Sequence, residues 1–141
     1  MEFWFKDERT DGNQLNKNQI FQLPVNPPTF EVQVGANNET FETEGLGEIN
    51  IIGEKKLATI TFSSFFPAQN YNFCVCTPRD DPYDYVWILD TFMHWRKPIR
   101  FIVTGTNINS LYSIENFTYK ENAMSRDIEF TLSLKEYKKL S

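Results

Sequence analysis

The sequence predicts a mainly β protein with one α-helix, folded as an antiparallel β-sandwich or split barrel. Three features lead to this fold class. Apolar residues alternate with polar ones along most of the chain, turns rich in Gly and Asn separate the alternating segments, and one segment changes to helical spacing. The 141 residues suffice for one hydrophobic core, so we expect a single domain over residues 1–141.

Three segments alternate most regularly between apolar and polar residues: 128-IEFTLSL-134, 57-LATITFSS-64 and 30-FEVQV-34. This pattern is typical of a strand with one face on a core and the other on water or a partner. In the third segment, Phe30, Val32 and Val34 are therefore expected to face inward. Weaker strand candidates are residues 2–6, 40–44, 48–52, 99–104 and 112–120.

The segment 81-DPYDYVWILDTFMHWRKP-98 departs from this alternation and predicts the helix. Asp81 is expected to cap the first turn with Pro82 at the first helical position, and Pro98 is expected to end the helix. Apolar side chains at helical spacing form a stripe that would pack on a sheet or close the end of a barrel. The stripe comprises Tyr85, Val86, Leu89, Phe92 and Met93.

Composition excludes several classes of function. A formal net charge of −5 argues against sequence-specific binding of nucleic acid, which needs clustered Lys and Arg. No run of about 18 apolar residues is present, so no membrane-spanning helix is expected. The polar segment 7–20 has no periodicity and predicts an exposed loop.

Residues that carry chemistry are sparse. Asp90 and His94 are one helical turn apart and could orient a general base or begin a metal site, but the preferred interpretation is two neighbouring residues on the helix surface. His94 is the only histidine, so a zinc site lacks ligands. Cys74 and Cys76 are too close in sequence for an easy disulfide and are expected to be reduced thiols. We therefore expect no catalytic, cofactor or metal site.

Aromatic residues make up 16% of the chain, and we predict that some of them form interfaces. Internal packing is the alternative for each of three patches. The first, at the end of a strand, comprises Phe65, Phe66, Pro67 and Tyr71. The second, on the helix, comprises Trp87 and Trp95, and the third is the extended segment 23-LPVNPP-28, with Leu23, Pro24, Pro27 and Pro28.

Within the first patch the alternation gives each ring a direction. Phe62 would point inward, and Phe66 would continue that face if the strand persists, whereas Phe65 falls on the opposite face. Exposed tryptophans also suit a glycan-binding module, which stays open as a second function.

Six local patterns, taken together in their order and spacing, resemble a known family. They are 23-LPVNP-27, 45-GLGEINII-52, 61-TFSSFFPA-68, 83-YDYV-86, 98-PIRFIVTG-105 and 128-IEFTLSLKEY-137. The family is the N-terminal domain of LysM-containing baseplate proteins of contractile phage tails and defective prophages, the PBSX-like type of Gram-positive bacteria. The resemblance covers residues 21–137.

The resemblance implies a structural protein of the virion with a fold of the tail-tube type and no catalytic residue or cofactor. Its partners would be its own copies, in a ring of six, together with tail-tube and tube-initiator proteins and hub or spike proteins. Assembly would take place in the cytoplasm of the bacterial host. Two departures stand out: no LysM module follows LSLKEY before Ser141, and the loop over 7–20 is longer than usual.

Overall fold

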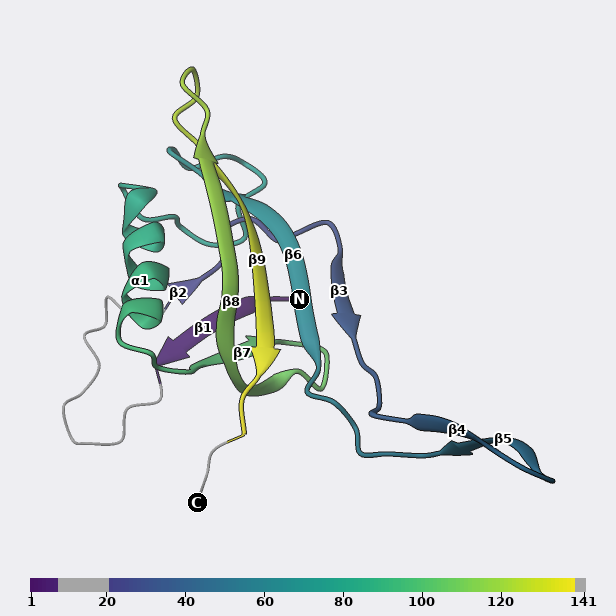
Figure 1. Ribbon diagram of the computed structural model, residues 1–141. Coiled ribbons are helices and arrows are strands. Elements are labelled where there is room, and N and C mark those ends of the chain that lie inside the picture. Colours follow the sequence, from purple (N-terminus) through teal and green to yellow (C-terminus); the bar gives the residue numbers. More distant parts are fainter. Residues whose placement is uncertain (8–20, 139–141) are drawn as a thin grey trace.

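The computed structural model describes residues 1–7 and 21–138, which form two sheets and one helix (Figure 1). The strands of the large sheet are β1 (Phe3–Asp7), β2 (Phe21–Gln22), β3 (Phe30–Gln33), β6 (Thr59–Phe66), β7 (Ile99–Val103), β8 (Asn109–Glu121) and β9 (Ile128–Glu136). The small sheet is a hairpin of β4 (Glu39–Thr43) and β5 (Gly47–Ile51), and the helix is α1 (Tyr83–His94). The expected loop over 7–20 lies outside the described residues, except for Asp7 at the end of β1.

The large sheet is antiparallel in the order β2-β1-β7-β8-β9-β6-β3, and it curls on itself. Three strands separate β1 from β6, yet the ring of Phe3 in β1 lies 6.1 Å from Phe62 in β6 and 5.6 Å from Phe30 in β3. Flat neighbouring strands are about 4.8 Å apart, so rings four strands apart could not meet without strong curvature. The predicted mainly β fold is confirmed, and its architecture is the split barrel.

The concave side of the curled sheet holds the core. Alternation along β6 and β9 buries Ile60, Phe62, Phe66, Leu132 and Leu134, as predicted. Aromatic rings fill much of the space between the opposed strands: Phe62 stacks on Phe101 at 5.6 Å. Packed rings of this kind exclude water from a large apolar area, which is the main stabilising contribution to such a fold.

Helix α1 closes the open side of the curled sheet (Figure 1). The ring of Tyr85 in α1 stacks on the ring of Phe66 at 4.7 Å and meets that of Phe21 edge-on at 5.1 Å. The helix begins at Tyr83 with Pro82 as its N-cap, so the prediction that Asp81 caps the helix and Pro82 is its first residue is wrong by one position. The Asp81 carboxylate still accepts a hydrogen bond from the Tyr83 N–H at 3.0 Å, which holds the turn that leads into the helix. The predicted stripe is buried with Ile88 added, whereas Met93 is only partly covered.

A bulge in β8 keeps both halves of this long strand in register with the core. The pairing with β9 shifts between Ile114 and Asn116, which leaves Glu115 as the extra residue. Tyr112 and Ile114 before the bulge and Phe117 after it therefore all pack toward the same side. Without the extra residue, Phe117 would turn to the outer face.

The prediction that Phe30, Val32 and Val34 face a core is wrong for the two valines. Val32 pairs with the buried Ile60, yet its own side chain is 44% exposed, and that of Val34 is 60% exposed. The reason is topological: β3 is the last strand of the sheet, and the core reaches only its first residue, Phe30, which packs against Phe3.

The β4–β5 hairpin projects away from the body of the protein (Figure 1). Its base is held by hydrogen bonds from the Asn37 N–H to the Glu54 carbonyl and from the Gly53 N–H to Asn38 Oδ1. The backbone carbonyl of Asn37 occupies the space where a Cβ on Gly53 would lie. A residue other than Gly at position 53 would therefore force the two chains at the base apart.

We expect Gly53→Ala to loosen the hairpin base while the core stays intact, because the overlap is confined to backbone outside the barrel. Hydrogen exchange should show at least about tenfold lower protection at the Asn37 amide, with the amides of β6 and β9 unchanged. Gly35→Ala is the matched control, since a Cβ there meets only the flexible end of Lys56 at 3.9 Å. Equal protection of Asn37 in both variants would contradict this account.

Candidate functional site

The first exposed surface is an aromatic patch at the end of β6, which we call the loop patch (Phe65, Tyr71 and Phe73). The Tyr71 and Phe73 rings stack at 5.0 Å, and Phe65 meets them edge-on at 6.4 and 5.9 Å. Phe73 is 57% exposed, and the other two rings are half-buried. Phe65 and Tyr71 thus lie together on the surface, on the side of the strand that the alternation indicated.

Asp127, the residue just before β9, fixes the loop patch in place. Its carboxylate accepts a hydrogen bond from the Tyr71 hydroxyl at 2.8 Å and another from the Ala68 N–H at 2.7 Å. Hydrogen bonds to a charged acceptor are among the stronger ones in proteins. The patch is therefore held in one arrangement before any partner arrives, which lowers the entropy lost on binding.

The second surface is the outer face of α1, where Trp87 and Trp95 are 57% and 45% exposed. Asp90 and His94 lie on the exposed part of the same helix. Within the described residues no hydrogen bond or ion pair joins these two side chains, and no group of three or more His, Cys, Asp or Glu is placed to hold a metal. The exposed tryptophans leave an aromatic surface on this side of the helix.

The prediction that Phe66 and Pro67 belong to an interface is wrong. Phe66 is completely buried, stacked at 4.2 Å on Phe130 and at 4.7 Å on Tyr85, and Pro67 is buried beside it. The strand persists through Phe66, so this ring keeps the inward direction of Phe62. Adjacent residues of a strand point to opposite faces of the sheet: Phe65 pairs with Glu129, and Phe66 pairs with Ile128.

The third predicted patch, 23-LPVNPP-28, is mostly an internal element. Leu23, Pro24 and Pro27 are buried, which leaves Pro28 as the exposed member of the predicted set. The backbone explains the difference: the Leu23 N–H donates to the Phe3 carbonyl, and the Pro24 carbonyl accepts from the Val75 N–H, both at 2.8 Å. The extended segment runs along its own domain, where the sequence suggested a neighbouring molecule.

A further exposed surface was not predicted as an interface: the edge strand β3 and the β4–β5 hairpin. Its exposed apolar side chains are Val32, Val34, Phe41, Leu46, Ile51 and Ile52. Phe41 pairs with Ile49 across the hairpin, so one face of the hairpin is apolar without any core to cover it. The signal was present in the alternation of residues 40–44 and 48–52, but alternation does not reveal what lies opposite the apolar face.

The two thiols are free, and Cys76 is partly sheltered. Its Sγ donates a weak hydrogen bond to the Gln22 carbonyl at 3.8 Å. Burial raises the pKa of Cys76 above its usual value, with smaller contributions from Cys74 and Glu2. A raised pKa lowers the thiolate fraction at neutral pH, which makes this thiol a poor nucleophile.

Burial also raises the pKa of Tyr85 above its ordinary value of 10.0, against the opposing effect of the Arg79 N–H that the phenolic oxygen accepts at 2.9 Å. The unfolded chain then loses the Tyr85 proton at lower pH than the folded protein does. The free energy of unfolding should therefore be insensitive to this group below pH 10.0 and should fall as the pH rises above that value.

Urea titrations between pH 8 and 11.5 test this expectation. Tyr85→Phe should show a shallower fall above pH 10.0 than the wild type. Part of the fall should remain, because burial raises the pKa of Tyr112 as well. An unchanged slope in Tyr85→Phe would contradict the assignment.

The fold and its surfaces can be compared with known proteins. No protein-family model matches the chain. The chain is similar to "Uncharacterized protein YqbP" of Bacillus subtilis (strain 168), with 32% identity over 121 residues, which are 85% of this chain and 55% of that protein. It thus spans about half the length of this curated relative.

Two solved structures share the fold, and both come from gene transfer agent (GTA) particles. One, from the tail of an empty particle with C6 symmetry, matches 99% of this chain and 93% of its own with a TM-score of 0.55 at 13% identity. The other, from the virion of the native particle, matches 87% and 88% with a TM-score of 0.52 at 12% identity. The predicted fold of the tail type is confirmed by these likenesses.

Among the described residues, α1 is too short to cross a bilayer, and no longer apolar helix is present.

Proposed function

We propose that this chain is a structural subunit of a phage-like tail and that it acts by assembling into a ring around the tail axis. The observation that carries the proposal is the end-to-end correspondence with a chain of a sixfold-symmetric tail, over 99% of this protein and 93% of that one. A correspondence over whole chains leaves little of either fold to support a different architecture.

The exposed surfaces support an assembling subunit. An isolated soluble domain rarely leaves an edge strand and several apolar faces uncovered, because both promote association with other chains. Here β3 is an open edge, and the loop patch, the outer face of α1 and the hairpin are all apolar surfaces outside the core. In a ring each surface would meet a different neighbour, and the same contacts would repeat around the axis.

Within the tail, we place this subunit in the baseplate of a contractile particle, between the tail tube and the central hub or spike. The series of motifs from 23-LPVNP-27 to 128-IEFTLSLKEY-137 supports this position. On this proposal the protein is a part of the virion, is present in six copies and has no enzymatic role.

Fractionation of particles from a producing bacterium tests the proposed function. The protein should sediment with intact tails in a density gradient and stay with them after washing in high salt. The double variant Phe73→Ser and Trp87→Ser should fold normally and be lost from tails, because both side chains are exposed in the subunit. The control is Met124→Ser, an exposed residue outside these surfaces. Wild-type protein absent from tails would overturn the proposal.

A glycan-binding module of the particle is the second candidate, because Trp87 and Trp95 are both accessible on one helix. Sugar rings stack on exposed aromatic faces, and such a site needs no metal or nucleophile. A cell-wall pull-down compares the wild type with the double variant Trp87→Ala and Trp95→Ala. Binding that the substitutions abolish would support this candidate, and a failure of the wild type to bind would exclude it.

A further inference from the structure

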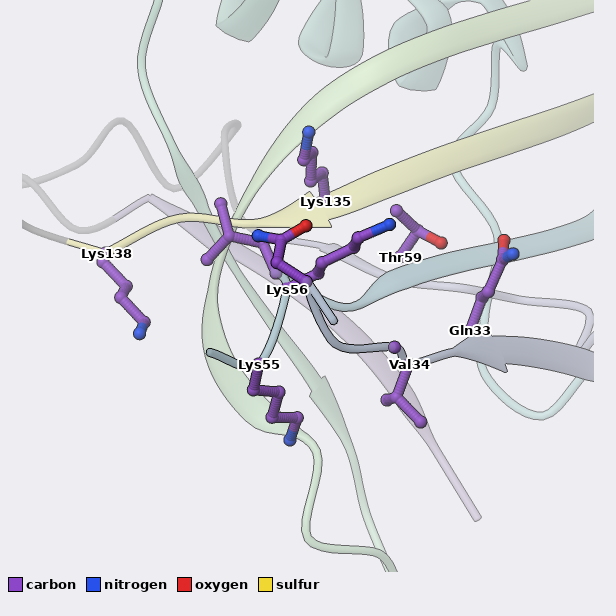
Figure 2. A pocket seen from close by; sticks show the side chains of 10 residues that line it. Gln33, Val34, Lys55, Lys56, Thr59, Lys135 and Lys138 are labelled. Carbon is purple, nitrogen blue, oxygen red and sulfur yellow. The ribbon is translucent and has the colours of Figure 1, made fainter. Parts of the chain in front are cut away.

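Four lysines gather in one hollow at the base of the β4–β5 hairpin, which we call the lysine pocket (Figure 2). Lys55 and Lys56 lie just before β6, Lys135 lies on β9, and Lys138 follows β9. The hollow has a volume of about 570 Å³, and Val34 and Leu57 give it an apolar wall. Such a concentration of cations is unexpected in a chain whose net charge is −5.

The ammonium groups of the lysine pocket form no ion pair within the part of the chain that the structure describes. The ion pairs resolved there join Lys120 to Glu129 and Arg126 to Glu121, and neither involves a lysine of the pocket. Figure 2 shows the side chains fanning out in different directions around the hollow. Cations spread in this way suit several separate anionic groups better than one small ion.

The β4–β5 hairpin carries the opposite charge. Residues 35–54 include five Glu and no Lys or Arg. Near the tip Glu42 lies directly opposite Glu48 in the pairing of the strands, and Glu44 lies in the connecting turn. Like charges opposite one another destabilise a strand pair unless cations offset them, and the hairpin supplies none.

The hairpin cannot deliver these carboxylates to the lysine pocket of its own chain. The pocket is at the hairpin's base, and the hairpin points away from the body (Figure 1). Five residues in each strand place the tip about 17 Å from the base, given a rise of about 3.4 Å per residue. The tip carboxylates could therefore reach such a pocket only on another molecule.

We infer that the lysine pocket receives the acidic tip of the β4–β5 hairpin from a second copy of this chain. The apolar parts of the two surfaces match as well: Leu46, 80% exposed at the tip, would meet Val34 and Leu57 in the pocket wall. Gly45 and Gly47, with φ of 101° and 73°, allow the tight turn that presents Leu46.

This contact is head-to-tail, because each copy offers a tip to one neighbour and a pocket to another. Contacts of this type close into rings or continue into helical stacks. The inference deepens the proposed function and rests on its requirement for contacts between copies. It adds which two surfaces meet and that charge selects them.

Charge reversal on each surface gives a direct test. The tip variant carries Glu42→Lys, Glu44→Lys and Glu48→Lys, and the pocket variant carries Lys55→Glu, Lys56→Glu and Lys135→Glu. All six side chains are exposed, so both variants should keep the far-UV circular dichroism and melting temperature of the wild type. Sedimentation velocity should show self-association of the wild type weakened at least about tenfold in each variant alone.

An equimolar mixture of the two variants should recover association, because each tip then meets a pocket of opposite charge. The chain with all six reversals should associate as the wild type does. A wild type that stays monomeric at all concentrations and salt levels, or reversals without effect on association, would overturn the inference. Binding of duplex DNA to the wild type that is lost only in the pocket variant would also overturn it, because the lysines would then bind phosphate groups.

These outcomes are separable from the test of the proposed function. Wild-type protein in tails together with reversal variants that associate normally would remove the inference alone. Charge-dependent association of a protein that never enters tails would remove the proposed function and leave the contact between copies intact.

Discussion

Phe66→Ala is expected to lower the free energy of unfolding by about 3–5 kcal/mol, the range for removing a fully buried phenylalanine. The ring is completely inaccessible and stacks on both Phe130 and Tyr85, so it joins the sheet to α1. Its loss leaves a cavity that the rigid sheet cannot close. Urea unfolding followed by circular dichroism measures the change.

The matched control is Phe65→Ala, one residue earlier in the same strand. Phe65 is half-buried on the opposite face of β6, so its loss should cost about 1 kcal/mol, the typical cost of a point substitution. A contact role for Phe66 would require the reverse: near wild-type stability of Phe66→Ala with loss of assembly. That pattern would also contradict the packing of α1 on the sheet described above.

Removal of the β4–β5 hairpin is expected to abolish association between copies while leaving the domain folded. Residues 39–51 can be replaced by Asn-Gly, a pair suited to a two-residue hairpin turn. The hairpin lies outside the hydrophobic core, so the free energy of unfolding should change by only about 1 kcal/mol. Sedimentation velocity should then show monomers at concentrations where the wild type associates.

The association of the shortened protein shows whether the hairpin makes a contact between copies. Glu39→Gln is the control, because it alters one charge at the hairpin base and leaves the three glutamates near the tip in place. If the shortened protein associates as strongly as the wild type, the hairpin makes no contact between copies. The contacts of the proposed ring would then have to come from the loop patch and α1 alone.

Local sequence patterns were sufficient to predict the elements that face the core. Alternation in β6 and β9 identified Ile60, Phe62 and Leu132 as inward residues, and helical spacing placed Tyr85 and Leu89 on the buried side of α1. These predictions succeed because each residue's direction follows from its position in a regular element, and all three elements pack against the core.

Alternation gives the wrong burial where the burial of a side chain depends on which distant strand lies opposite it. Val32 and Val34 have the same pattern as Ile60 and Phe62, but Val32 lies in the edge strand β3 and Val34 just after it, and neither has a core opposite it. Conversely, Leu23 looks like part of an exposed extended segment, but a hydrogen bond from its N–H to the Phe3 carbonyl holds it against β1, and its side chain is buried. Neither result is encoded within a short window of sequence, because each depends on where distant strands lie.

The lysine pocket shows the same limit for a candidate site. Lys56 and Lys135 are far apart in the chain, and the pairing of Thr59 with Lys135 between β6 and β9 brings them together. The acidic character of residues 39–54, in contrast, can be read directly from the sequence. The complementarity between the two becomes visible only when the strand order is known.

A symmetry-resolved electron cryomicroscopy map of the assembled tail tests the central claim most directly. The account predicts copies of this chain in a closed ring around the tail axis, with the acidic hairpin tip of each copy against the lysine pocket of another. A map that places the chain as an isolated monomer away from the axis would contradict it.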